Sequence, residues 1–351
     1  MPVDVTPEGL GYSRRMIGWA RSGVGRARRW PSRAAAVAAG LLVVFAGGCT
    51  WQAGALQPKG PGAQRQYEVF LISFWTGLAV YVIVGGLMLI AMFRRRRADE
   101  DEARFPANRF VFIGGLLVPT VILMGMMGAT FVYLAQEPHS GELDVTVIGH
   151  QYWWEVHYPE HDVVTANEIY IPTGTDVEFR FETVDVIHAF WVPELHGKSD
   201  MVPGRSTRLV IHADEPGRYR GQCAEYCGLQ HANMAFEVVA VSPEEFDNWA
   251  EAQARPAVVD DPRGEELFIR HACAGCHAIR GTDADGQIGP DLTHLASRAM
   301  LGAGTVPNDR GHLSGWIVNS QTIKPGNEMP PITTLEPDEL HALLDYLENL
   351  Q

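Results

Sequence analysis

Two long uncharged runs constrain this chain of 351 residues more than any other feature. Residues 69–93 and residues 110–135 contain no Asp, Glu, Lys or Arg. Either run is long enough to cross a hydrocarbon core about 30 Å thick as a helix. Four arginines, Arg94–Arg97, lie between the runs, and the positive-inside rule places such a connection in the cytoplasm. We therefore predict a two-helix transmembrane hairpin over residues 67–135, with everything after residue 136 facing outward.

The N-terminus has the features of an export signal. Basic residues precede an apolar run at residues 34–45, and small residues follow it. The run is too short to span a bilayer comfortably. Residues 46–49 (Ala-Gly-Gly-Cys) then resemble the cleavage site of a bacterial lipoprotein, with Cys49 as the lipidated residue. An ordinary signal followed by a free or buried Cys49 is the alternative. We predict a signal peptide over residues 1–48 and a short N-terminal segment over residues 49–66.

The charge of the chain argues against nucleic-acid binding. Its formal net charge is -14, although residues 1–48 are rich in arginine, so the rest of the chain is more acidic still. Phosphate backbones require clustered positive charge, whereas an acidic surface favours a basic protein partner.

The residues after the hairpin predict two further domains. Short β-rich segments separated by Gly, Pro and Asp turns indicate an all-β sandwich or Greek-key barrel over residues 136–242. Ser242, followed by Pro and two Glu, predicts a helix start, so residues 243–262 should form a helix and a linker. Residues 263–351 are predicted to be mostly helical, ending in a helix with one leucine-rich face. The predicted strands are 143–147, 168–171, 177–181, 207–211 and 235–241.

A cluster of soft ligands lies in the β-rich part. Cys223, Cys227, His231 and Met234 offer two thiolates, an imidazole and a thioether within one loop. Sulfur ligands combined with histidine suit copper. His188, which stands in an apolar and aromatic stretch, is the candidate for a ligand from outside the loop. A disulfide between the two cysteines is the alternative, because an exported protein meets an oxidising compartment.

A second motif follows in the helical part. Cys273 and Cys276, with His277 directly after, form the C-x-x-C-H pattern in which two thiols bind haem covalently and the histidine ligates iron. We predict Met329 as the second axial ligand. Met300 is its rival, although it lies in a run that looks helical. A zinc site is the other reading, but His271, His294 and His312 lack the paired spacing that zinc ligands show.

The loop around Cys223, the D-V-x-H-x-F-W-V-P stretch around His188 and the membrane hairpin together resemble subunit II of the haem-copper cytochrome c oxidases. The fused C-x-x-C-H domain resembles a class I cytochrome c, as in the caa-type oxidases. The resemblance implies a multidomain membrane protein: a transmembrane hairpin, an all-β cupredoxin domain (a Greek-key barrel) over residues 136–242, and an all-α cytochrome c domain over residues 263–351.

The resemblance also implies a ligand set for a dinuclear copper centre, CuA. Cys223 and Cys227 would bridge both copper ions, and His188 and His231 would each ligate one. Met234 and the backbone carbonyl of Glu225 would be weaker ligands. The Glu225 side chain would reach a magnesium site shared with subunit I, and residues 198–204 match the K-x-D-x-[IV]-P-G segment at the subunit I interface.

Two positions depart from the family pattern. Tyr152 stands where stand-alone subunits have the first Trp of an aromatic triplet, at which a soluble cytochrome c passes its electron. A tethered donor would explain the change, with Tyr152 and Trp153 as a candidate path; simple packing is the alternative. The family's glutamate seven residues before a membrane proline is replaced by Phe112, seven residues before Pro119, so the usual proton-entry carboxylate is missing.

The function implied by the resemblance is electron input to a cytochrome c oxidase. Electrons from a cytochrome c or a quinol–cytochrome c reductase would pass through haem c and CuA to subunit I, which with the other oxidase subunits reduces O2 to water and translocates protons. The protein would lie in the bacterial cytoplasmic membrane, with both redox domains on the outer face. The CuA subunit of a nitric-oxide reductase is one alternative, although Glu225 and residues 198–204 favour the oxidase. A disulfide-stapled lipoprotein scaffold is the other.

Overall fold

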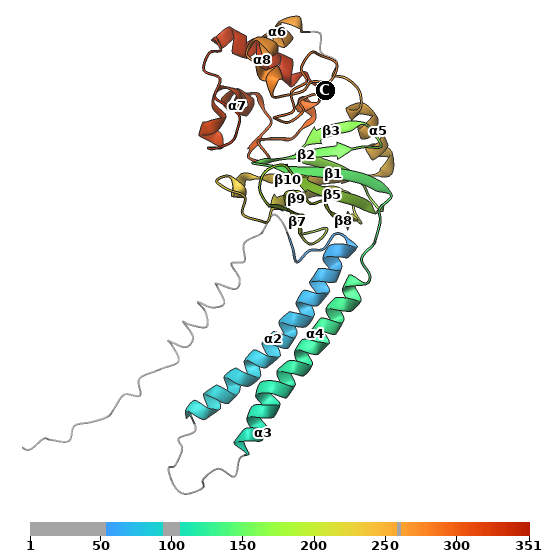
Figure 1. Ribbon diagram of the computed structural model, residues 1–351, viewed down its shortest axis with the longest axis vertical. Coiled ribbons are helices and arrows are strands. Elements are labelled where there is room, and N and C mark those ends of the chain that lie inside the picture. Colours follow the sequence, from blue (N-terminus) through green and yellow to red (C-terminus); the bar gives the residue numbers. More distant parts are fainter. Residues whose placement is uncertain (1–53, 94–105, 258–260) are drawn as a thin grey trace, which may run out of the picture. The chain divides into compact units, whose positions relative to one another are not determined.

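The computed structural model describes residues 54–93, 106–257 and 261–351 (Figure 1). The signal peptide, the lipidation site at Cys49 and the arginines Arg94–Arg97 lie outside these residues.

Two helices are long and apolar enough to cross a membrane, and they lie side by side in Figure 1. The first is α2 (Pro61–Phe93); the second consists of α3 (Ala107–Phe112), the π-helical segment η1 (Ile113–Leu117) and α4 (Val118–Leu134). The most apolar window of each helix contains no buried residue, as expected for a surface that meets lipid rather than protein.

Helix α2 begins well before the uncharged run at residues 69–93, because the charged residues of its first turns have partners. Arg65 pairs with Glu137 at 2.7 Å, and Glu68 accepts a hydrogen bond from Tyr133 Oη at 2.7 Å. The backbone N–H of Ala63 donates to the carbonyl of Leu195 in the β domain (2.9 Å). The start of the helix is therefore joined to the β domain.

The β domain is a sandwich of two five-stranded sheets, with the strand orders β3-β2-β1-β5-β8 and β4-β10-β9-β6-β7. Side chains of β1 alternate between buried and half-buried positions, which is the pattern of a strand with one face on the core. Two parallel pairings, β1 with β5 and β4 with β10, mark the crossovers. All five predicted strands are present. The strands are β1 (Leu143–His150), β2 (Trp153–Tyr158), β3 (Val163–Ala166), β4 (Glu168–Pro172), β5 (Val177–Thr183), β6 (His188–Trp191), β7 (Ser199–Met201), β8 (Thr207–Ile211), β9 (Gly217–Cys223) and β10 (Ala235–Val241).

Aromatic side chains fill the core between the sheets. Phe190 stacks on Phe236 with ring centroids 4.3 Å apart, and Trp154 meets the edge of Phe236 at 5.1 Å. Trp154 is fully buried, and its indole also contacts the ring of His188 at 5.9 Å. The candidate copper ligand His188 is thus held by the packed core.

Helix α5 (Pro243–Gln253) follows the sandwich and begins as predicted. The Ser242 hydroxyl accepts from the Glu245 N–H, and the Glu245 carboxylate accepts from the Ser242 N–H, which forms a capping box.

The C-terminal domain is mainly helical, as predicted. The helix predicted around Met300 is wrong. The chain forms only a short 3-10 turn, η4, before it, and Met300 then pairs in extended form with Pro307 in a small β-ladder. The helix α8 carries the predicted leucine face, and Leu350, just beyond its end, is also buried. The elements are α6 (Pro262–Arg270), η3 (Cys273–Gly275), η4 (Leu295–Ser297), β11 (Met300–Leu301), β12 (Val306–Pro307), α7 (Arg310–Ile323) and α8 (Pro337–Glu348).

Candidate copper and haem sites

The copper loop is the segment between β9 and β10, from Cys223 to Met234, and both of its ends are fixed by strands. Cys223 is the last residue of β9, and its N–H donates to the carbonyl of Met234 at 3.2 Å, which closes the loop. His188 begins the neighbouring strand β6, whose residue Phe190 is opposite Cys223. Strand pairing therefore brings the distant histidine to the loop.

The predicted copper ligands converge on the two sulfur atoms of the loop. Cys223 Sγ lies 3.8 Å from His188 Nδ1 and 3.2 Å from the carbonyl oxygen of Glu225. Cys227 Sγ lies 3.6 Å from His231 Nδ1 and 3.8 Å from Met234 Sδ. Four donors, namely the two histidine nitrogens, the Glu225 carbonyl oxygen and the Met234 sulfur, therefore surround the pair of cysteines.

The spacing of the two sulfur atoms fits shared metal ions and excludes a disulfide in this structure. Cys223 Sγ and Cys227 Sγ are 3.9 Å apart and both cysteines are free, whereas a disulfide bond is about 2.05 Å long. Two sulfur atoms that both bind the same metal ion at about 2.3 Å lie no more than about 4.6 Å apart. The residues present therefore fit the copper centre that the family resemblance implies.

The two thiols of the loop affect each other's ionisation. Their mutual hydrogen bond lowers the pKa of Cys223 and raises the pKa of Cys227. Because metal ligands must be deprotonated, copper binding would displace the remaining proton.

Asp185 orients the buried His188. Its carboxylate Oδ1 lies 2.8 Å from His188 Nε2, which leaves Nδ1 directed at Cys223. Burial by itself raises the pKa of Asp185, but hydrogen bonds from His188 and from the backbone N–H groups of Val186 and Gln151 outweigh it and lower the pKa below 3.8. The aspartate therefore stays anionic at neutral pH and holds the imidazole ring in one orientation.

The Glu225 side chain does not join the sulfur cluster. Its carboxylate lies 3.4 Å from Lys198 Nζ, which also donates to Asp200 at 2.7 Å. Lys198 and Asp200 belong to the K-x-D-x-V-P-G segment, so the structure joins that segment to the copper loop. Magnesium binding at Glu225 remains a prediction.

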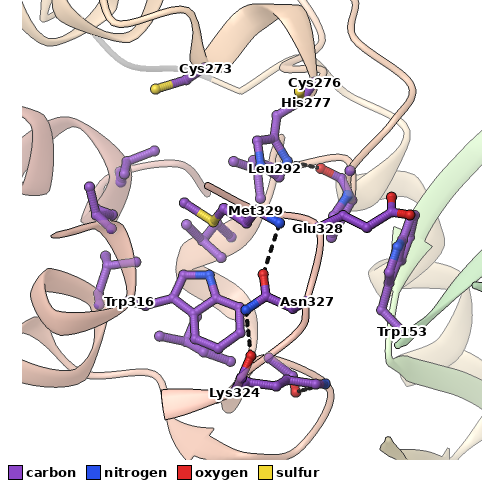
Figure 2. A pocket seen from close by; sticks show the side chains of 18 of the residues that line it. Trp153, Cys273, Cys276, His277, Leu292, Trp316, Lys324, Asn327, Glu328 and Met329 are labelled. Carbon is purple, nitrogen blue, oxygen red and sulfur yellow. Dashed lines mark hydrogen bonds between the residues drawn. The ribbon is translucent and has the colours of Figure 1, made fainter. Parts of the chain in front are cut away.

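The second site is a cavity of about 410 Å³ beside the C-x-x-C-H motif. Cys273, Cys276 and His277 line one part of it, and Met329 lines another (Figure 2). Met300 also lines this cavity, from β11, so the structure brings both candidate methionines to it. Met329 remains the predicted axial ligand.

His277 is prepared to bind through one nitrogen. Its Nδ1 lies 2.7 Å from the carbonyl of Pro290, which can only accept, so Nδ1 carries the proton and Nε2 is free. Burial lowers the pKa of His277, which keeps the ring neutral. Gly289 packs on the ring: a Cβ there would lie 2.5 Å from His277 Cε1. The cavity therefore fits a haem attached at the two cysteines.

Arg298 is a cavity residue that the sequence did not reveal. Its side chain is buried, and Nε has no hydrogen-bond partner among the described residues. An unpaired buried donor is costly, and a haem carries carboxylates that could accept from it. No sequence motif around Arg298 signals this role.

The histidines considered for zinc do not gather at the C-x-x-C-H motif. His271 lies 3.4 Å from Glu339, His294 contacts the backbone carbonyls of residues 253 and 255, and His312 pairs with Asp309. In the described part of the chain, the one group of three close metal-ligating side chains is His188, Cys223 and Cys227.

Tyr152 and Trp153 line the haem cavity from the β domain. The Tyr152 hydroxyl also accepts a hydrogen bond from the N–H of Leu229 in the copper loop, at 3.0 Å. Tyr152 therefore connects the haem cavity to the copper loop.

Comparisons with known proteins match both of the domains that hold these candidate sites. The family model for the periplasmic domain of cytochrome c oxidase subunit II matches residues 160–241, and the model for cytochrome c matches residues 262–351. A cytochrome c oxidase subunit 2 from Alkalihalophilus pseudofirmus is 32% identical, over 92% of this chain and 98% of that protein. The corresponding subunit from Bacillus subtilis is 28% identical, over 84% and 91%. A quinol oxidase subunit 2 from Bacillus cereus is 31% identical, but over only 64% of this chain and 81% of its own.

The first of these relatives is matched over nearly its whole length, and the two family models fall on the domains that hold the candidate copper and haem sites. The chain therefore belongs to the cytochrome c oxidase subunit 2 family, in a form whose C-terminal part is a cytochrome c domain.

Proposed function

We propose that this chain is the electron-input subunit of a caa-type cytochrome c oxidase. It would receive electrons from an external cytochrome c, or from a quinol–cytochrome c reductase, at the haem domain and deliver them from the copper loop to subunit I for the reduction of O2 to water. Haem c and dinuclear copper, when bound, accept and release single electrons. The observation that carries the proposal is Tyr152, which lines the haem cavity and bonds the copper loop through its hydroxyl.

The residues of the chain have separate tasks in this function. Cys273, Cys276, His277 and Met329 would hold the haem, and Arg298 would bind one of its carboxylates. Cys223, Cys227, His188, His231, Met234 and the Glu225 carbonyl would hold copper. The packed, hydrogen-bonded surroundings of both sets would restrict ligand movement, so that little rearrangement accompanies each electron.

The same proposal extends to the membrane and to the partner subunits. The two apolar helices would lie in the bacterial cytoplasmic membrane, with both redox domains on the outer face. Glu225 and the Lys198–Gly204 segment would face subunit I, where a shared magnesium ion is the predicted occupant, and the other oxidase subunits would complete the complex. Because residues 110–135 contain no acid, proton entry would use another route in the complex.

The decisive experiment follows haem oxidation in the purified complex. With reduced donor and O2, the complex should consume O2, and a copper spectrum in the near infrared should accompany the covalent haem band. The variant H188N should stop O2 consumption and leave the haem reduced. H212N is the matched control, because His212 pairs with Asp176 elsewhere in the same domain. A wild-type complex that turns over NO but not O2 would make the chain the CuA subunit of a nitric-oxide reductase; a chain with neither absorption band would be a scaffold.

A further inference from the structure

Lys324 is a buried lysine that lines the haem cavity but has no assigned part in holding copper or haem. It is the residue at the C-terminal end of α7, and its side chain is almost fully buried. Its ammonium donates to two backbone carbonyls, those of Tyr152 at 2.8 Å and Gly302 at 2.7 Å. None of the ion pairs among the described residues includes it. A buried cation without an acidic partner is costly, so a position that keeps one calls for an explanation.

On one side, Lys324 is connected to the predicted haem ligand. The carbonyl of Lys324 accepts from Asn327 Nδ2 at 2.7 Å, and Asn327 Oδ1 accepts from the N–H of Met329 at 2.8 Å, as Figure 2 shows. Ser320, one turn before Lys324, donates to the Met329 carbonyl at 2.7 Å. The residues around Lys324 therefore hold the backbone of Met329 in place.

On the other side, Lys324 is connected to the copper loop. Tyr152, whose carbonyl accepts from Lys324, accepts from the N–H of Leu229 with its hydroxyl. Leu229 lies between the copper ligands Cys227 and His231.

A second contact supports the same connection. Gln230 Nε2, also in the copper loop, donates to the carbonyl of Pro325, the residue after Lys324, at 2.7 Å. The next residue, Gly326, has φ +82°, and a Cβ there would lie 2.8 Å from Leu229 Cδ2. The backbone after Lys324 thus lies directly against the copper loop.

We propose that Lys324 is a positioning residue for electron transfer: it joins the loop of the haem ligand Met329 to Tyr152 and so holds the haem-domain loop against the copper loop. This inference rests on the proposed function. Burial lowers the pKa of Lys324 to about 7. Both the ammonium and the neutral amine have enough N–H groups for the two carbonyls.

The test compares K324M with K59M in the full complex. Methionine is unbranched and apolar, so it can fill the space of the buried lysine stem, but it cannot donate to the carbonyls of Tyr152 and Gly302. Lys59 is a surface residue paired with Glu215, which makes K59M a control for the same chemical change. Two quantities are measured: the rate of haem-to-copper electron transfer after photoreduction of the haem, and hydrogen exchange of the Leu229 amide.

We expect K324M to slow the transfer about tenfold or more, as small misplacements of reacting groups do. Exchange at Leu229 should become faster, while the copper and haem spectra stay unchanged and K59M behaves like the wild type. An unchanged transfer rate in K324M would overturn the proposal.

If K324M fails to bind copper or haem, Y152F decides the question. It keeps the carbonyl that Lys324 bonds and removes only the hydroxyl that accepts from Leu229, so transfer should slow and Leu229 should exchange faster. Wild-type rates for both quantities in Y152F would refute the inferred connection. A wild-type complex without haem-to-copper transfer would instead refute the proposed function.

Discussion

Asp185 Oδ1 and His188 Nε2 lie 2.8 Å apart, and this contact turns the opposite ring nitrogen of a fully buried histidine toward Cys223. Removing the carboxylate charge while keeping the shape, in D185N, should weaken copper binding by about 10–100-fold, the usual effect of losing a partner behind a metal ligand. Copper titration of the protein, followed by its near-infrared absorption, measures the change.

The matched control for D185N is D176N. Asp176 makes a contact of the same length with His212, away from the copper loop. Equal copper affinity in D185N and D176N would show that Asp185 does not orient the ligand.

Met329 and Met300 line the same cavity, and substituting each separately distinguishes them. M329L should lower the reduction potential of the haem, because a thioether ligand raises it, and should abolish the near-infrared band of a methionine–iron bond. M300L should retain the band, since its position on β11 serves packing. The reverse result would assign the axial position to Met300. Redox titration and absorption spectroscopy of both variants provide the measurement.

Gly289 is required by the His277 ring. In G289A the new methyl group would lie 2.5 Å from His277 Cε1, so the ring or the loop must move. We expect a loss of about 1–3 kcal/mol in the free energy of unfolding, as for other overpacked sites, and a lower yield of haem-containing protein.

G275A is the control for G289A. Gly275 lies inside the C-x-x-C-H motif, but a Cβ there meets no atom within 4 Å. In thermal unfolding and absorbance measurements, G275A should keep the wild-type melting temperature and haem-to-protein ratio. A loss in G275A comparable to that in G289A would mean that any added methyl group near the motif is harmful.

Glu155 should make stability depend on pH in the acid range. Burial by itself raises its pKa, but hydrogen bonds from His150 and His157 outweigh it and lower the pKa from 4.5 to about 2. A carboxyl with a depressed pKa in the folded state stabilises the fold above its unfolded pKa, and the stabilisation is lost as pH falls from about 4.5 to 2. The melting temperatures of wild type and E155Q should therefore differ at pH 7 and approach each other across that window.

E160Q, at an exposed turn residue, provides the comparison for E155Q. Its melting temperature should follow the wild type at every pH. A difference between E155Q and wild type that stays constant from pH 7 to pH 2 would contradict the role given to Glu155.

Local sequence could predict the copper loop because its ligands are close together in the chain. Two thiols, an imidazole and a thioether between residues 223 and 234 restrict the chemistry before any fold is known. The orienting contact of Asp185, the unpaired Nε of Arg298 and the bonds of Lys324 were beyond such reasoning. Each depends on tertiary contacts; Lys324 and Tyr152, for example, are 172 positions apart.

Two features of the secondary structure depend on distant contacts. The run ending at Met300 consists of residues that suit a helix, but pairing with Pro307 holds it extended. Helix α2 begins earlier than the apolar run because Arg65 forms an ion pair with Glu137, which is 72 positions away in the chain. In both cases a distant contact overrides local preference.

The short connection from α5 into the haem domain has a consequence for kinetic order. A redox partner on the same polypeptide needs no encounter in solution, because the covalent connection sets its effective concentration. Electron delivery to the copper loop would then be first order and insensitive to the ionic strength that governs encounters between separate charged proteins. Only the earlier step, in which the external donor meets the haem domain, would still depend on collision.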